Sequence, residues 1–267
     1  MAKRVFALLS VVVVSLALAC GGGGGGDSVP FWSKLYDDSL GLWPKNVHVD
    51  GDDIFFCGET DFNHLLHGLA VKLNEQGEII WAKEVADDLN RVQFYSCVPT
   101  GDGGAVFAGA HSVFQQNNDG YMVKFNSDGS IAWQFIFGES ESDTFFDVVA
   151  RPEGGYLAVG STRSYNQSDV SDMWLVAVDE NGDLQTSITL GTSEHDVAYS
   201  AAYDENGALF FTGWTELSGD RDIVLGKFNI DTFEWVKYYS GDDGDWALDI
   251  DVRNGAVAIA AKTQSFS

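Results

Sequence analysis

The chain repeats itself about every 50 residues, and this period constrains its fold more than any other feature. Each repeat has four short apolar runs with the alternation of β-strands, joined by turns rich in Gly, Asn and Asp. The repeats begin at Trp32, Trp81, Trp133, Thr186 and Trp235. A single unit of this size cannot bury both faces of its sheet, so neighbouring repeats must stack and share a core.

Four strands per repeat at this period are typical of the blades of a β-propeller. We therefore predict an all-β fold, a β-propeller of four-stranded antiparallel blades whose strands a to d run from the axis outward. The four complete blades are expected at residues 41–85, 90–137, 143–190 and 195–239. Partial strands are expected outside them, namely a d strand near Trp32, an a strand at 246–252 and a b strand at 256–261. We interpret this count as a truncated propeller; the alternatives are a five-bladed ring with a three-stranded closing blade and a solenoid of hairpins.

The blade endings share an apolar strand, an Asp or Asn turn with Gly, and then a Trp. The pattern stands at residues 71–81 and 123–133, returns weakened at 225–235, and lacks its Trp in the copy at 176–186. These endings resemble those of PQQ-like (quinoprotein-type) bacterial propeller repeats. The resemblance implies that the repeated tryptophans dock each blade on the next. They are Trp81, Trp133 and Trp235.

Residues 1–19 have the pattern of a secretory signal peptide. Two cations precede an apolar run of 15 residues, Val5–Ala19, whereas a membrane-spanning helix needs about 20. The run ends in Ala17-Leu18-Ala19-Cys20 and is followed by six glycines, which resembles the lipobox of bacterial lipoproteins. The resemblance implies a lipid on Cys20, with residues 20–30 as a flexible tether to a repeat domain at 31–267. Ordinary cleavage after the Ala-Leu-Ala sequence, giving a secreted protein, is the alternative.

Location and charge limit the partners. Gly21 rather than Asp follows the cysteine, and by the same resemblance this favours an outer-membrane lipoprotein of the bacterial cell envelope, bound to the membrane through its lipid. The net charge of −25 becomes more negative once Lys3 and Arg4 are removed with the signal. Such a surface repels nucleic acid, so we expect no nucleic-acid partner; it would attract a basic partner or simply keep the protein soluble.

Two cysteines remain in the repeat domain. Cys57 and Cys97 fall on neighbouring repeats, in a compartment that permits disulfides. Their spacing does not establish whether the two Cα atoms come close enough for a bridge. A disulfide and a pair of buried free thiols therefore both stay open.

Three acids recur at one position of the repeat, each ten residues after a repeat start. They are Asp143, Asp196 and Asp245. Equivalent positions on different blades are spread around the ring, so these carboxylates cannot converge on one metal ion. We predict that they are structural and accept backbone N–H groups where a strand begins.

No other cluster predicts a metal site or cofactor. The acidic loops at 139–143 and 242–245 offer oxygen ligands for Ca²⁺ but lack the spacing of a calcium-binding loop, so solvated turns are favoured and calcium is the alternative. His64 and His67 are three residues apart without a zinc-binding motif, and a plain surface loop is favoured for them. The G-x-S-x-G and phosphate-loop motifs are also missing, which favours a protein that is not an enzyme.

The long, dissimilar loops of the repeat indicate where a partner would bind. In an up-and-down blade the b–c and d–a loops share one face of the disc, and the b–c loops vary most, at 58–68, 109–120, 160–172 and 213–222. Varied loops on a regular scaffold commonly carry function. The candidate binding residues are aromatics that break the repeat, namely Phe62, Phe114, Tyr165 and Trp214.

Together these features predict a lipid-anchored propeller of the cell envelope that binds a protein or a glycan. The main alternative is a fragment of a propeller enzyme or cofactor protein, such as a relative of quinoproteins or of polysaccharide lyases. A decayed, truncated gene is a third interpretation.

Overall fold

A computed structural model describes residues 14–15, 33–34, 42–62, 65–85, 90–113, 117–166, 169–217, 219–229 and 232–264. Within these ranges every regular element is a β-strand, and no helix long and apolar enough to cross a membrane is present. Most of the predicted signal peptide and tether, including Cys20, lies outside the described residues, as do Trp32, His64 and Phe114. Two short strands, β1 (Val14–Ser15) and β2 (Ser33–Lys34), pair with each other.

Four antiparallel four-stranded sheets follow one another along the chain. The first holds β3 (Leu42–Asp50), β4 (Asp53–Phe62), β5 (Leu65–Asn74) and β6 (Ile79–Val85). The second holds β7 (Asn90–Pro99), β8 (Ala105–Val113), β9 (Asp119–Phe125) and β10 (Ile131–Phe137). The third holds β11 (Asp143–Ala150), β12 (Tyr156–Thr162), β13 (Asp172–Val178) and β14 (Leu184–Leu190). The fourth holds β15 (Asp196–Tyr203), β16 (Ala208–Thr215), β17 (Asp222–Asn229) and β18 (Thr232–Tyr239).

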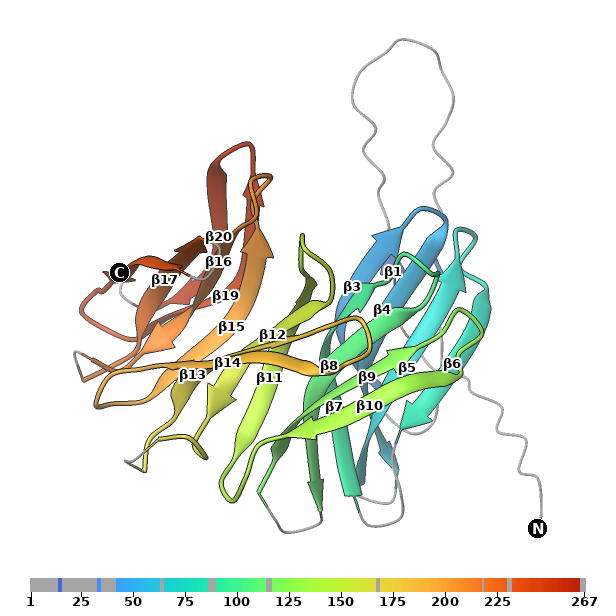
Figure 1. The fold of residues 1–267 in the computed structure, drawn as a ribbon, viewed down its shortest axis with the longest axis horizontal. Coiled ribbons are helices and arrows are strands. Elements are labelled where there is room, and N and C mark those ends of the chain that lie inside the picture. The colour runs from blue at the N-terminus through green and yellow to red at the C-terminus, as the bar shows by residue number, and fades with distance from the viewer. Residues whose placement is uncertain are drawn as a thin grey trace.

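These sheets are the predicted blades, numbered 1 to 4 below. A final pair, β19 (Asp245–Arg253) and β20 (Ala256–Thr263), supplies the expected a and b strands after them. The first strands of consecutive sheets, β3, β7, β11, β15 and β19, contact one another, so they are the innermost strands. The sheets fan out in an arc with β3–β6 toward one end and β19–β20 toward the other (Figure 1). The prediction of an all-β propeller with four-stranded antiparallel blades is confirmed.

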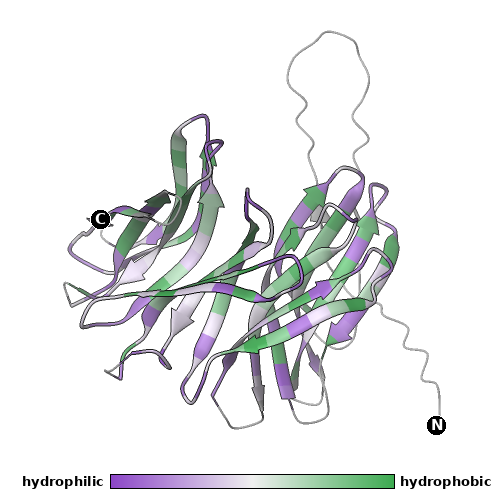
Figure 2. Cartoon of the chain, in the orientation of Figure 1, coloured by the Kyte–Doolittle hydropathy of each residue, from purple (hydrophilic) through white to green (hydrophobic). Residues whose placement is uncertain are grey.

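The core lies between blades rather than inside any one of them. Hydrophobic residues follow the strands while hydrophilic residues gather at many of the turns (Figure 2). One cluster joins Phe55 and Cys57 of blade 1 to Phe94 and Phe107 of blade 2, and a second joins blade 2 to blade 3 around the fully buried Trp174. Each sheet therefore buries its faces only against its neighbours, as the repeat requires.

A bulge in every innermost strand sets the register of the sheets. The pairing slips by one residue at Lys45, Tyr95, Phe146, Tyr199 and Leu248. Three of the bulged side chains contact one another in sequence, with tilted rings whose centroids lie 5.4 Å apart for Tyr95 and Phe146 and 4.8 Å apart for Phe146 and Tyr199. A bulge re-aims the extra side chain, and here it turns aromatic rings toward one another along the inner strands.

Candidate functional site

The repeated tryptophans lie at the boundaries between blades. Trp81 of β6 is 7% exposed, and its ring centroid lies 5.6 Å from that of Phe125 in blade 2. Its indole Nε1 donates a hydrogen bond to the backbone oxygen of Ser127, at 3.1 Å, in the turn of blade 2 that precedes β10. Gly129 in that turn has a positive φ of 77°, and a Cβ there would press on the indole ring. Gly129 therefore adopts the positive φ that the turn requires, and its lack of a side chain leaves room for Trp81 of the preceding blade.

Trp133 repeats the arrangement between blades 2 and 3. Its Nε1 donates to the backbone oxygen of Glu180 at 2.9 Å, and its ring centroid lies 6.2 Å from that of Tyr156. Gly182, with a φ of 84°, again leaves room for the indole ring. This half-buried indole, hydrogen-bonded to the next blade, helps to fix the spacing and the angle of the two sheets.

Trp235 packs at the boundary between blade 4 and the final pair of strands. Its ring is 6.2 Å from that of Phe210, and it borders the cluster that includes Ile250 and Val252 of β19. The Lys237 ammonium lies 4.9 Å from the centre of the same ring. All three tryptophans therefore lie at a boundary between neighbouring sheets.

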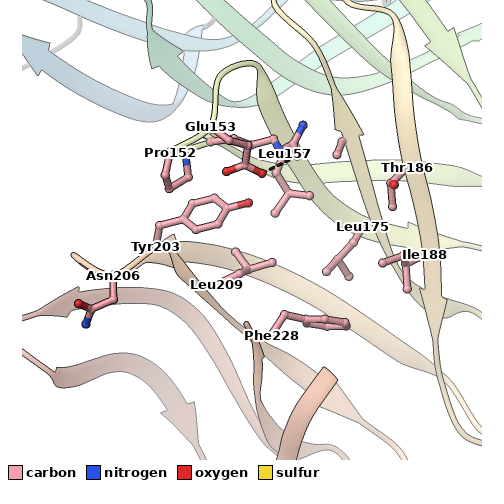
Figure 3. Close-up of a pocket in the computed structure, with 13 residues that line it drawn as sticks. Pro152, Glu153, Leu157, Leu175, Thr186, Ile188, Tyr203, Asn206, Leu209 and Phe228 are labelled. Carbon is pink, nitrogen blue, oxygen red and sulfur yellow. Dashed lines mark hydrogen bonds and ion pairs between the residues drawn. The ribbon is translucent and has the colours of Figure 1, made fainter. Parts of the chain in front are cut away.

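A pocket lies at the boundary where the repeat has no tryptophan. Thr186 occupies the Trp position of blade 3, and it borders a cavity of about 550 Å³ between blades 3 and 4. The floor is apolar, and the labelled side chains converge on one space from the two blades (Figure 3). Its lining includes Leu157, Leu175, Ala177, Thr186, Leu209 and Phe228.

Polar groups stand at the rim of this pocket. Arg151 and Glu153 form an ion pair at 2.5 Å. Burial raises the pKa of the Tyr203 hydroxyl to about 12, and the charge of Glu153 adds to the effect. Tyr203 therefore stays a hydrogen-bond donor at any physiological pH. An apolar floor with a few polar groups at the edge is the usual composition of a small-molecule site.

The recurrent acids sit where strands begin, on the opposite face of the disc from this pocket. Asp143 is fully buried and accepts hydrogen bonds from the Glu139 amide at 3.3 Å, the Ser164 hydroxyl at 2.5 Å and the Thr162 hydroxyl. It thereby ties the d–a loop before β11 to the b–c loop after β12. Asp196 accepts from the Thr192 amide at 2.6 Å, and Asp245 from the Gln264 amide at 3.2 Å.

The candidate binding aromatics differ in accessibility. Tyr165 is 44% exposed on the b–c loop of blade 3, with its ring 5.6 Å from that of Trp174. Trp214 is only 6% exposed in the fully buried strand β16, and the Arg221 guanidinium lies 4.2 Å from the centre of its ring. Phe62 ends β4, and its side chain, like the whole of Phe114, lies outside the described residues. Of the two aromatic side chains that the structure describes, the Tyr165 ring is open to solvent. The Trp214 ring is buried, with the Arg221 guanidinium against it.

The innermost strands carry a chain of polar contacts that sequence reasoning missed. The Asp147 carboxylate lies 2.6 Å from the Ser96 hydroxyl of blade 2 and 3.0 Å from the Ser200 hydroxyl of blade 4. The same Ser200 oxygen lies 2.9 Å from Asp249. All four residues directly follow a bulge, so alignment of the repeats at the bulged position would have found them. Burial raises the pKa of Asp147, which favours its protonated form.

The remaining candidates are two cysteines and a histidine. Cys57 and Cys97 are buried free thiols in adjacent blades, and the contact with Cys57 together with burial holds the pKa of Cys97 well above its usual value. His67 Nδ1 lies 2.9 Å from the Glu84 carboxylate. Among the described residues no three His, Cys, Asp or Glu side chains come together in a group that could hold a metal ion.

Comparison with known proteins supports the fold alone. No family model matches the chain, and no curated protein matches its sequence. A structure of a puromycin hydrolase mutant complexed with PGG superposes on 84% of this chain with a TM-score of 0.55 at 14% identity. A second puromycin hydrolase structure gives 0.53 over the same share, also at 14% identity. The chain spans 36% of the length of either protein, and an identity this low says nothing about shared chemistry.

Proposed function

We propose that this chain is a lipid-anchored, non-enzymatic propeller of the bacterial cell envelope that binds a protein or a glycan. Its binding surface is the loop face, defined as the b–c loops together with the d–a loops beside them. The lipid on Cys20, the outer-membrane location and the kinship with PQQ-like repeats belong to the same proposal. They rest on the residue patterns at 17–26 and at the blade endings.

The observation that carries the proposal is the contrast between the two faces of the disc. The b–c connections differ in every blade, at residues 63–64, 114–118, 163–171 and 216–221. On the other face, the a–b turns at 100–104, 151–155 and 204–208 close with the same pair of backbone hydrogen bonds. Regular turns with varied loops opposite them are the arrangement expected of a scaffold that presents a recognition surface.

The loop face is also held in place by the scaffold beneath it. Asp143 fastens the loops of blade 3, and Asp196 fastens the d–a loop before blade 4. Loops that are fixed before binding lose less conformational entropy on contact with a partner. This face offers two large side chains, Tyr165 and Arg221, and Arg221 is stacked on Trp214. Tyrosine and arginine are both enriched at binding hot spots.

The test replaces these side chains in cells and follows partner contact by site-specific cross-linking from the loop face. Tyr165→Ala combined with Arg221→Ala is expected to reduce cross-linking to envelope proteins or glycans by about tenfold, because two anchor side chains are lost. Leu184→Ala is the matched control, since Leu184 is 57% exposed on another part of blade 3. Cys20→Ser should release the protein from the membrane fraction. Equal cross-linking by the double variant and the wild type, or membrane attachment without Cys20, would contradict the proposal.

A further inference from the structure

The boundary between blades 3 and 4 departs from the others at two repeat positions, and both departures remove bulk. The Trp position, filled by Trp81 in blade 1 and Trp133 in blade 2, holds Thr186 in blade 3. The neighbouring strand has a lysine at one position in blades 1, 2 and 4, and blade 3 has Ala177 there. Thr186 and Ala177 both line the pocket.

The missing lysine has a defined place in the other blades. Lys72 is 5% exposed, pairs with Asp53 at 2.6 Å and donates to the backbone oxygen of Gly103 in blade 2 at 2.9 Å. Lys124 pairs with Asp102 at 2.8 Å, and Lys227 pairs with Glu234 at 2.9 Å. In blade 3 the acid at the position of Asp102 is Glu153, which pairs with Arg151 instead. Blade 3 therefore leaves open both the space that the lysine side chain fills and the space that the indole fills in other blades.

The rest of the boundary keeps the walls that hold an indole elsewhere. Trp81 lies between Phe55 of its own blade, at 6.2 Å, and Phe125 of the next, at 5.6 Å. The corresponding residues are Leu157 and Phe228, and both line the pocket. A cavity of about 550 Å³ lies within the range of small-ligand sites, and an open space lined by apolar side chains favours an apolar occupant.

We propose that this pocket binds a planar aromatic ring of the size of an indole, in the place that the repeat gives to Trp81 and Trp133. The ring would lie between Leu157 and Phe228, with Leu175 and Leu209 beneath it. It would come either from a free aromatic molecule or from a tryptophan side chain of a polypeptide. The site is on the face opposite the loop face, so it goes beyond the proposed function and can stand or fall independently of it.

The experiment is calorimetric titration of the whole processed chain with indole and, separately, with N-acetyltryptophanamide. Saturable one-to-one binding of indole is expected. Thr186→Trp, which supplies the repeat's own ring, should weaken it by about tenfold or more, and Ala177→Lys should also weaken it. Thr189→Trp is the matched control, because it adds the same ring to the other side of the same strand, and it should bind as the wild type does.

The two probes separate the sources of the ring. Binding of both probes would identify a polypeptide tryptophan as a sufficient ligand, and binding of indole alone would identify a free small molecule; either result supports the site. Circular dichroism of each variant confirms that it is folded. Absence of binding to the wild type, or equal binding by folded Thr186→Trp and Ala177→Lys, would overturn the proposal.

Discussion

At the scale of single residues, Asp147 and Ser200 show how the inner strands are joined. The Ser200 oxygen lies within hydrogen-bond distance of both Asp147 and Asp249, yet a hydroxyl has one proton to donate. Both contacts are hydrogen bonds only when one of the carboxyls carries a proton. Burial raises the pKa of Asp147, against the lowering effect of the four groups that donate to its carboxylate, the Ser96 and Ser200 hydroxyls and the Val148 and Ala201 amides.

The raised pKa of Asp147 makes stability depend on pH with a definite sign. An unfolded Asp loses its proton near pH 4, whereas folded Asp147 keeps it to a higher pH. Its contribution to stability is therefore full in acid and declines as the pH rises from about 4 through the raised pKa. Asn has the shape of a protonated Asp, so Asp147→Asn should gain stability relative to the wild type as the pH rises over this interval. Urea unfolding of both proteins at several pH values measures the difference, and a difference that does not change with pH would contradict a raised pKa for Asp147.

At the scale of strands, one glycine in each complete blade is required by the bulge of the innermost strand. The b strands place Gly58, Gly109, Gly160 and Gly213 against the strand that carries the bulge. A Cβ on any of them would overlap a backbone carbonyl oxygen of that strand. Backbone atoms cannot move aside as the end of a flexible side chain can, so the glycine and the bulge depend on each other.

Gly160→Ala is therefore expected to destabilise the protein by about 1–3 kcal/mol, because the added methyl forces β11 and β12 apart. Gly101→Ala is the control, since a Cβ at Gly101 meets open space and the residue has no positive φ. Chemical unfolding of both variants gives the comparison. A Gly160→Ala protein as stable as Gly101→Ala would show that the strands accept the methyl without strain.

The sequence predicts these strands well because their signals are local. Turns such as 126–130 combine an Asn side chain with a glycine at positive φ, and the tryptophan that follows recurs with the period. The consequences of Thr186 are harder to predict, since the pocket also needs Ala177 on another strand and Phe228 on another blade. The same limit applies to Trp214, whose contact with Arg221 depends on a residue beyond the end of its own strand.

At the scale of the whole molecule, the sheets form a row in which neighbours share apolar clusters. Trp81, Trp133 and Trp235 each cross from one sheet to the next, and the boundary without a tryptophan is the one that contains the pocket. Stability in such repeats is approximately the sum of terms within units and terms between neighbours. A tryptophan introduced at the same repeat position of another blade should therefore stabilise the boundary there as well.

The measurement that tests this claim most directly is the free energy of unfolding of Trp81→Thr and Thr186→Trp beside the wild type. Loss of the buried indole should cost about 3–5 kcal/mol, and filling the open boundary should add about 0.5–2 kcal/mol. Trp43→Ala is the control, because Trp43 is 45% exposed and should matter little. A Thr186→Trp protein less stable than the wild type, or a Trp81→Thr protein as stable as Trp43→Ala, would contradict the account.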